Sequence, residues 1–379
     1  TKGIRHERVL KPVFRDCRGE PACSPWRYDM ALPQQVLTPD DILLVTGGGK
    51  GITAECAAAL AQDYGMRLVL LGRATPEKDL ELFNNLARFQ KMGINFKYFQ
   101  TDVTDAEAVK ATVAETVREW GAITALLHGA GANQPTLLRN LDETTFQRTV
   151  APKVGGLRHL LAAIDPKHLR LLVSFGSIIA TTGMPGEADY AVANEWLAAM
   201  TADFQKAHPN CRCLTLEWSV WSEIGMGRRL GSDDILAQQG ITPISPDVGV
   251  AVLRQVLENN WASTVVVTGR MPDVPTLHLE RPDMPFFRFL ENPRVYYPGI
   301  ELVIETELSL VSDPHLNDHI YEGQRLFAAV MGLEAMAQVA STVLGVKKVP
   351  VFENVEFSRP VVVDETRSET LQIAALVQN

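Results

Sequence analysis

The stretch ILLVTGGGKGIT, residues 42–53, joins a short apolar run to a turn that contains four glycines. An apolar run bounded by glycine is typical of a strand buried in a parallel sheet. A glycine-rich turn between such a strand and a helix lets the backbone approach a pyrophosphate, and the helix N-terminus supplies a favourable dipole. By itself the cluster of Gly47, Gly48, Gly49 and Gly51 is also compatible with a tight turn that binds nothing.

The pattern of this stretch repeats along the chain. Between Asp41 and Arg270, seven strand-like runs alternate with amphipathic helical stretches; the runs are ILLVTG, RLVLLGR, NFKYFQTD, ALLHGAG, LRLLVSFGS, CRCLTLEW and STVVVTG. This alternation predicts an α/β fold of the Rossmann type over residues 41–270, with one doubly wound parallel sheet covered by helices on both faces.

Polar residues follow several of these strands, at the edge where open α/β sheets bind ligands. Arg73 ends the run LLGR, where its guanidinium could meet the 2′-phosphate of NADPH, and a surface arginine is the alternative. Asp102, in TDVTD, could hold the adenine end of such a cofactor or cap the helix that begins near Asp105.

A second informative stretch is FGSIIATTGMPGEADYAVANEW, residues 175–196. Ser177 ends a predicted strand, and Tyr190 and Asn194 lie one turn apart on a predicted helix, so these two share a helix face. The three side chains are expected at one cleft. Alone, each could be a helix-cap serine, a core tyrosine or a polar helix residue.

Residues 42–270 resemble a short-chain dehydrogenase/reductase, and specifically the ketoreductase domain of a type I polyketide synthase. The resemblance rests on TGGGKGIT, LLGR, TDVTD, HGAG, APKVGG, the Ser177–Tyr190–Asn194 set and EWSVWSEIGMG, which cover about three fifths of the chain. It implies a cofactor, NADPH, held by Thr46, Gly47, Gly48, Gly49, Gly51, Ile52, Arg73, Asp102, Val103, Gly129 and Ala130.

The resemblance also implies roles for the polar side chains. Tyr190 would donate a proton to the reduced carbonyl oxygen, and Lys153 would help the phenol to release it, because nearby positive charge favours the phenolate. Ser177 would hydrogen-bond the carbonyl, and Asn194 would order the proton relay.

Two departures from the family pattern are visible. Thr53 replaces the usual last glycine of the cofactor turn, which is expected to crowd the helix against the strand. The family's markers of product stereochemistry are also missing, since ANQPTLL follows HGAG and Thr182 stands eight residues before Tyr190. The sequence of the segment GEADYAVANEW looks most like the corresponding sequence in iterative synthases of the enediyne or polyunsaturated-lipid kind.

The segment EWSVWSEIGMG occupies the position of a substrate-covering lid in this family. Trp218, Trp221 and Met226 would close over an acyl chain and exclude water, with an ordinary core role as the alternative.

The remaining regions differ in character. Residues 1–40 are rich in turn formers, and residues 271–300 contain six prolines, which predicts an extended linker. Residues 301–379 resemble the opening of a polyketide dehydratase, a partial α+β hot-dog domain with strands at IELVIETELSL, NVEFSRPVVV and ETLQIAALVQ. There His319 matches the family's general base, Ala328 replaces an expected proline, and no later helix is available to supply the partner acid, so dehydration is not expected from this chain alone.

Bulk composition limits the class of protein. The net charge of −9 argues against nucleic acid as a partner, and five cysteines form no even disulfide framework, which favours a cytoplasmic setting. Residues 326–346 are long and apolar enough to suggest a membrane span, but Glu334 and Gln338 interrupt them, so a buried helix and no membrane are predicted. No metal site is predicted.

The sequence therefore predicts an NADPH-dependent reductase of β-ketoacyl thioesters. Its partners would be an acyl carrier protein, whose phosphopantetheine arm presents the substrate, and other synthase domains; a homodimer is left open. The alternatives are a free-standing reductase of small ketones, and a non-catalytic scaffold that binds nucleotide and dimerises through its hot-dog half.

Overall fold

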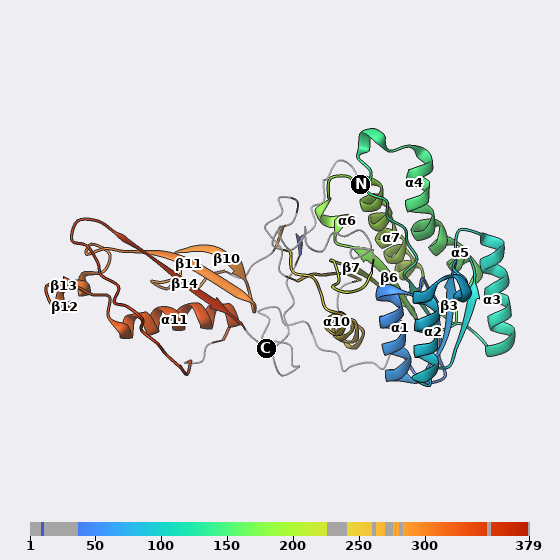
Figure 1. Ribbon diagram of the computed structural model, residues 1–379, viewed down its shortest axis with the longest axis horizontal. Helices are drawn as coiled ribbons and strands as arrows, with labels where there is room; N and C mark the ends of the chain where they lie inside the picture. The colour runs from blue at the N-terminus through green and yellow to red at the C-terminus, as the bar shows by residue number, and fades with distance from the viewer. Residues whose placement is uncertain are drawn as a thin grey trace. The chain divides into compact units, whose positions relative to one another are not determined.

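The computed structural model describes residues 9–10, 37–225, 241–259, 263–269, 276, 278–279, 283–346 and 350–377 (Figure 1). The chain divides into two compact units, one within residues 29–277 and the other within residues 1–28 and 278–379. Most of the N-terminal segment predicted at residues 1–40 lies outside the described residues, as does Met226. Within residues 1–28, the short strand β1 (Val9–Leu10) pairs in parallel with β9 (His278–Leu279) of the same unit.

The first unit is built on a seven-stranded parallel sheet of order β4-β3-β2-β5-β6-β7-β8. Its strands are β2 (Ile42–Thr46), β3 (Arg67–Gly72), β4 (Phe96–Gln100), β5 (Ala125–His128), β6 (Leu171–Ser177), β7 (Arg212–Trp218) and β8 (Thr264–Val267). Each coincides with one of the seven predicted runs. The strand order reverses beside β2, which places the switch point of the sheet next to the glycine turn.

Helices cover both faces of this sheet (Figure 1). Leu43 and Val45 of β2 pack with α1 (Gly51–Tyr64), α2 (Leu80–Lys91) and α10 (Pro246–Glu258), whereas Ile42 and Leu44 pack with α3 (Ala106–Trp120), α5 (Gly156–Ala163) and α7 (Ala188–Ala207). Alternate residues of one strand therefore enter two separate cores, as the doubly wound prediction requires. The shorter elements are η1 (Pro76–Lys78), η2 (Leu138–Asn140), α4 (Glu143–Val150), the π-helical turn η3 (Ala151–Gly155) and α6 (Ile179–Thr182).

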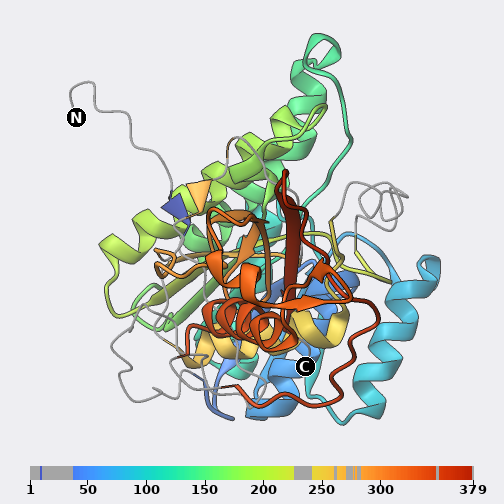
Figure 2. The same ribbon diagram turned by 90° about the vertical axis from the view of Figure 1, so that its left-hand side faces the viewer.

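The second unit is a separate antiparallel region that is consistent with a partial dehydratase domain. Strands β10 (Asn292–Tyr297), β11 (Glu301–Leu308) and β14 (Glu369–Leu376) form a sheet, and α11 (Ala329–Leu344) packs across one face through Ala335, Val339 and Val343 (Figure 2, orange and red). The alternating residues of β11 explain this packing, since its buried side chains all face the helix side. The turn η4 (Pro314–Asp318) and the hairpin β12 (Ile320–Tyr321)–β13 (Gln324–Arg325) complete the unit.

Two predictions for the C-terminal region differ from the structure. Strand β10 lies inside the predicted linker; Pro293 is tolerated there because β10 is an edge strand with an irregular register beside this residue. The run NVEFSRPVVV forms no strand, only a bridge from Val362 to Leu326, because Asn354 has a positive φ of 55° and Pro360 has no N–H to donate.

Helix α11 is shorter than the apolar segment that contains it, at 16 residues. Among the described residues, no helix is both long enough and apolar enough to cross a membrane.

Candidate active site

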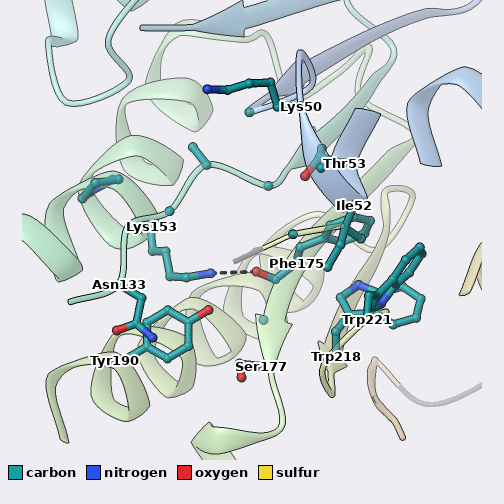
Figure 3. Close-up of a pocket in the computed structure, with 18 of the residues that line it drawn as sticks. Lys50, Ile52, Thr53, Asn133, Lys153, Phe175, Ser177, Tyr190, Trp218 and Trp221 are labelled. Atoms are coloured by element: carbon teal, nitrogen blue, oxygen red, sulfur yellow. Dashed lines mark hydrogen bonds between the residues drawn. The ribbon is translucent and has the colours of Figure 1, made fainter. Parts of the chain in front are cut away.

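A cleft of about 880 Å³ opens at the carboxyl ends of the parallel strands. Residues that end or directly follow each of the seven strands line it: Gly47, Arg73, Thr101, Gly129, Ser177, Trp218 and Thr268. The cleft runs from the glycine turn to the first turn of α7, where Tyr190 lies (Figure 3). Most of the predicted site residues of the first unit therefore meet in one place.

Tyr190 and Ser177 form one end of this cleft. Tyr190 is 6% exposed in α7, and the Ser177 hydroxyl at the end of β6 accepts a hydrogen bond from the Ile179 N–H at 3.3 Å. Burial raises the pKa of Tyr190 to about 12, and hydrogen bonding with the side chains of Asn194 and Ser177 opposes the rise. The phenol is therefore protonated at neutral pH and can act as a proton donor.

Lys153 places a cation beside this phenol. Its Nζ lies 5.5 Å from the centre of the Tyr190 ring and donates a hydrogen bond to the Phe175 carbonyl at 2.9 Å (Figure 3). Burial lowers the pKa of Lys153 to about 8, so the amine is still charged at neutral pH. The lysine projects from the π-helical turn η3, a type of turn frequent at functional sites.

Asn194 does not line the cleft. It is fully buried behind Tyr190, and its amide nitrogen donates a hydrogen bond to the Tyr190 backbone carbonyl at 2.7 Å. Besides the interaction that opposes the rise of the Tyr190 pKa, the Asn194 side chain therefore contacts the backbone of the tyrosine. The sequence pattern did not separate this position from one that faces the cleft.

The glycine turn has the backbone shape that its sequence predicts. Gly47 and Gly51 have φ values of +70° and +59°, a region that residues with a side chain rarely adopt. No side chain caps α1 at its N-cap residue Lys50, and the first turn of the helix contains no acidic residue. An anion at this helix end would meet a favourable dipole, and the Glu81 carboxylate of α2 already accepts a hydrogen bond from the Gly51 N–H there at 3.2 Å.

Not every residue predicted to hold the cofactor faces the cleft. Gly47, Gly49, Gly51, Ile52, Arg73, Asp102, Val103, Gly129 and Ala130 line it. Thr46 and Gly48 instead face the interior: Thr46 is fully buried, and a Cβ at Gly48 would lie 2.5 Å from the Val45 side chain. Their roles are in packing and hydrogen bonding beneath the turn.

Thr53, the departure from the glycine pattern, is accommodated by Gly129. A Cβ at Gly129 would lie 2.2 Å from the Thr53 hydroxyl, so the threonine fills space that a side chain there would need. The expected crowding around Thr53 of α1 is therefore relieved by the missing side chain of Gly129, directly after β5.

The other end of the cleft has two cations. Arg73 is exposed at the end of β3, and no carboxylate among the described residues pairs with it, whereas Lys50 pairs with Asp79 at 2.6 Å. Asp102 accepts hydrogen bonds from Thr104, and Asp105 caps α3, so the helix-capping alternative for Asp102 is wrong. Sequence reasoning missed Lys50, although a basic residue inside the glycine turn was a usable signal.

The two tryptophans of the predicted lid belong to the core. Trp218 and Trp221 are buried, contact each other edge to face at 5.0 Å, and also line the cleft. Gly249 of α10 makes room for them, because a Cβ there would lie 2.2 Å from the Trp221 ring. This favours the core interpretation for both residues.

His319 lies in the second unit, between η4 and β12, and is exposed. Its role as a general base stays a prediction.

His128, at the end of β5, is fully buried, and burial lowers its pKa to about 4. The folded state therefore keeps this ring neutral, whereas the unfolded chain takes up a proton below the ordinary value of 6.5. Stability that is present above pH 6.5 is lost as the pH falls toward 4. We expect about 2 kcal/mol of the free energy of unfolding to be lost between about pH 7.5 and about pH 5. Urea denaturation at the two pH values, compared with His128→Gln, checks this; an equal loss in both proteins would contradict it.

Comparisons with known proteins agree with this geometry. Residues 42–223 match the KR domain family, and residues 294–379 match the polyketide synthase dehydratase domain family. The chain is 29% identical to Polyketide synthase PksL of Bacillus subtilis over 268 residues, which cover 66% of this chain and 6% of PksL. The chain therefore spans a small part of the length of such relatives.

Solved structures show the same fold. A structure of A-type ketoreductases from a modular polyketide synthase is 25% identical, with a TM-score of 0.57, and the match covers 65% of this chain and 51% of that one. An alcohol dehydrogenase from the archaeon Thermococcus sibiricus is 20% identical with a TM-score of 0.51, covering 64% and 99%. The chain therefore carries a KR domain followed by the N-terminal domain of a polyketide synthase dehydratase, and it is homologous to type I polyketide synthases.

Proposed function

We propose that residues 42–270 reduce a β-ketoacyl thioester to the β-hydroxyacyl thioester with NADPH, as one step of a polyketide synthase. The observation that carries this proposal is the convergence of Tyr190, Ser177 and Lys153 in one cleft that begins at a glycine turn. The relatives are themselves polyketide synthases and ketoreductases, which supports the same reaction here.

NADPH, when bound, supplies the hydride. Ser177 hydrogen-bonds the substrate carbonyl and stabilises the negative charge that develops on its oxygen. Tyr190 gives its phenolic proton to that oxygen, which leaves a hydroxyl on the substrate and a phenolate on the protein. The ammonium of Lys153 stabilises the phenolate, and the nearly complete burial of both groups strengthens this interaction. Asn194 holds the backbone of the tyrosine from behind.

The residues present fit a dinucleotide with a 2′-phosphate. Gly47, Gly49 and Gly51 line the cleft at the N-terminus of α1, where a pyrophosphate would replace the Glu81 carboxylate as acceptor of the Gly51 N–H, and Arg73 stands at the end of β3. The alcohol dehydrogenase from Thermococcus sibiricus, at 20% identity, is complexed with 5-hydroxy-NADP, which is consistent with NADPH as the cofactor proposed here.

Arg73→Ala should weaken NADPH binding by about tenfold or more and leave NADH binding nearly unchanged, because only NADPH carries the phosphate that a guanidinium recognises. Fluorescence titration with each cofactor measures this difference. Arg118→Ala, on the exposed face of α3, is the matched control. Equal weakening of both cofactors would contradict the assignment.

The function is tested by NADPH oxidation by the purified chain with a short β-ketoacyl thioester and, in parallel, with a small free ketone. Turnover of the thioester alone supports the proposal, and equal turnover of both supports a free-standing ketone reductase. NADPH binding without turnover of either would favour the scaffold.

We infer an acyl carrier protein as the partner that presents the thioester, together with other synthase domains, and the iterative or enediyne-like subtype stays a prediction. Cys56, Cys211 and Cys213 are free thiols, which supports a reducing, cytoplasmic setting. A homodimer also stays a prediction, and sedimentation of the purified chain tests it.

A further inference from the structure

A chain of buried hydrogen bonds connects the glycine turn to the lysine of the candidate active site. Thr46, the last residue of β2, and His128, the last residue of β5, are both 0% exposed. The Thr46 hydroxyl lies 2.8 Å from His128 Nδ1, and His128 Nε2 lies 2.9 Å from the backbone carbonyl of Lys153. None of the roles assigned above uses the histidine.

The chemistry of these groups fixes the direction of each hydrogen bond. A backbone carbonyl only accepts, so His128 Nε2 must carry the proton and donate it to Lys153. A neutral imidazole then has an acceptor at Nδ1, so the Thr46 hydroxyl donates to it. The same hydroxyl accepts from the Ala130 N–H at 3.2 Å. All members of the chain are therefore satisfied in one arrangement only.

The carbonyl that His128 binds belongs to an irregular turn. In η3 the Gly156 N–H reaches the carbonyls of both Ala151 and Lys153, and Pro152 supplies no N–H. The hydrogen bond from His128, which comes from outside the helix, is therefore well placed to fix the backbone position of Lys153 in this turn. Close packing adds to this restraint: a Cβ at Gly156 would lie 3.3 Å from the His128 ring, and one at Gly131 would lie 3.1 Å from the Lys153 side chain.

We propose that His128 is a positioning residue, which holds the backbone of Lys153 so that its ammonium stays between the Phe175 carbonyl and the Tyr190 ring. Through Thr46, the same chain links the lysine to the start of the glycine turn. The inference rests on the proposed function only in taking Lys153 as the group that assists Tyr190. His128 itself touches neither the substrate nor the cofactor, because it is sealed beneath the cleft.

Two amide variants separate the two hydrogen bonds of the histidine. The Gln amide reaches about as far as Nε2 and can still donate to Lys153, whereas the Asn amide occupies the position of Nδ1 and keeps only the partner Thr46. Each variant loses one buried hydrogen bond, so His128→Gln and His128→Asn should melt at similar temperatures. Thr201→Val is the matched control, because it removes a buried hydrogen bond to Ser174 of 2.8 Å away from the cleft.

The first readout is kcat for thioester reduction by the full chain. His128→Asn should lower kcat by about tenfold to a hundredfold, the cost of a small misplacement of a catalytic group, while His128→Gln and Thr201→Val stay near the wild-type value. The second readout is the titration of Lys153 followed by NMR of ¹³C-labelled lysine, with Lys153→Met identifying the resonance. Tyr190 from α7 and His128 from β5 are titratable groups that face this amine.

In the wild type the Lys153 resonance should titrate near pH 8. In His128→Asn it should move toward the ordinary lysine value, and in His128→Gln it should not move. The titration needs no turnover, so it tests the inference even if the proposed function fails. Equal behaviour of the Asn and Gln variants in kcat and titration would overturn it. If neither folds, Thr46→Val breaks the chain from its other end, and an unchanged titration would then overturn the inference.

Discussion

Tyr190→Phe is expected to lower kcat for β-ketoacyl thioester reduction by about a thousandfold, because it removes the proton that neutralises the developing alkoxide. The substitution removes one oxygen atom from a buried ring and leaves the packing of α7 intact. NADPH affinity should change by no more than about fivefold, the contribution of one hydrogen bond. Stopped-flow reduction and cofactor titration on the same preparation separate these two quantities.

Tyr64→Phe provides the control for this experiment, since Tyr64 ends α1 and packs against the core away from the cleft. It should reduce the substrate at the wild-type rate. Wild-type activity in Tyr190→Phe would remove the tyrosine from the mechanism, and an equal loss in both variants would point to a general effect on folding.

Lys153→Met should lower kcat by about a hundredfold at neutral pH, because it removes the cation that stabilises the tyrosine phenolate. The dependence of kcat on pH tests the role of Lys153 more specifically. Burial places the pKa of Lys153 at about 8, and that of Tyr190 at about 12, so the lysine is the first of the two to lose its proton as the pH rises. In the wild type, kcat should therefore fall about tenfold per pH unit above pH 8. This decline should be absent in Lys153→Met.

Lys206→Met is the matched variant for this measurement, because Lys206 lies on the exposed face of α7, where it pairs with Asp203 at 2.8 Å. Its pH profile should match the wild type. Persistence of the decline above pH 8 in Lys153→Met would assign it to another group.

The sheet could be predicted from the sequence because buried parallel strands leave continuous apolar runs. All seven such runs form strands, and Ser177 and Tyr190 meet as the strand and helix assignments require, whereas Lys153 is indicated only by the family resemblance. The run NVEFSRPVVV is also predicted as a strand but forms none, because the positive φ of Asn354 and the missing N–H of Pro360 interrupt strand pairing.

The residues that lie beneath the cleft could not be predicted in the same way. A polar residue at the end of a strand or in a neighbouring helix can face the cleft or lie beneath it, and sequence position does not distinguish the two. Thr46 and Asn194 lie beneath the cleft, whereas Arg73 and Ser177 face it. The contact of His128 with Lys153 joins residues 25 positions apart through a π-helical turn, and no periodic pattern signals such a turn.

The fit of Thr53 against Gly129 ties together the evolutionary histories of two distant positions. With Thr53 in place, a methyl group at residue 129 would collide with the threonine hydroxyl, so Gly129→Ala is closed to this chain as a single step. If Thr53 first became glycine, the three closest contacts of that alanine, all of them with the threonine side chain, would be gone. The order in which the two substitutions arise therefore decides whether the lineage passes through a folded intermediate, which is epistasis set by the geometry of one contact.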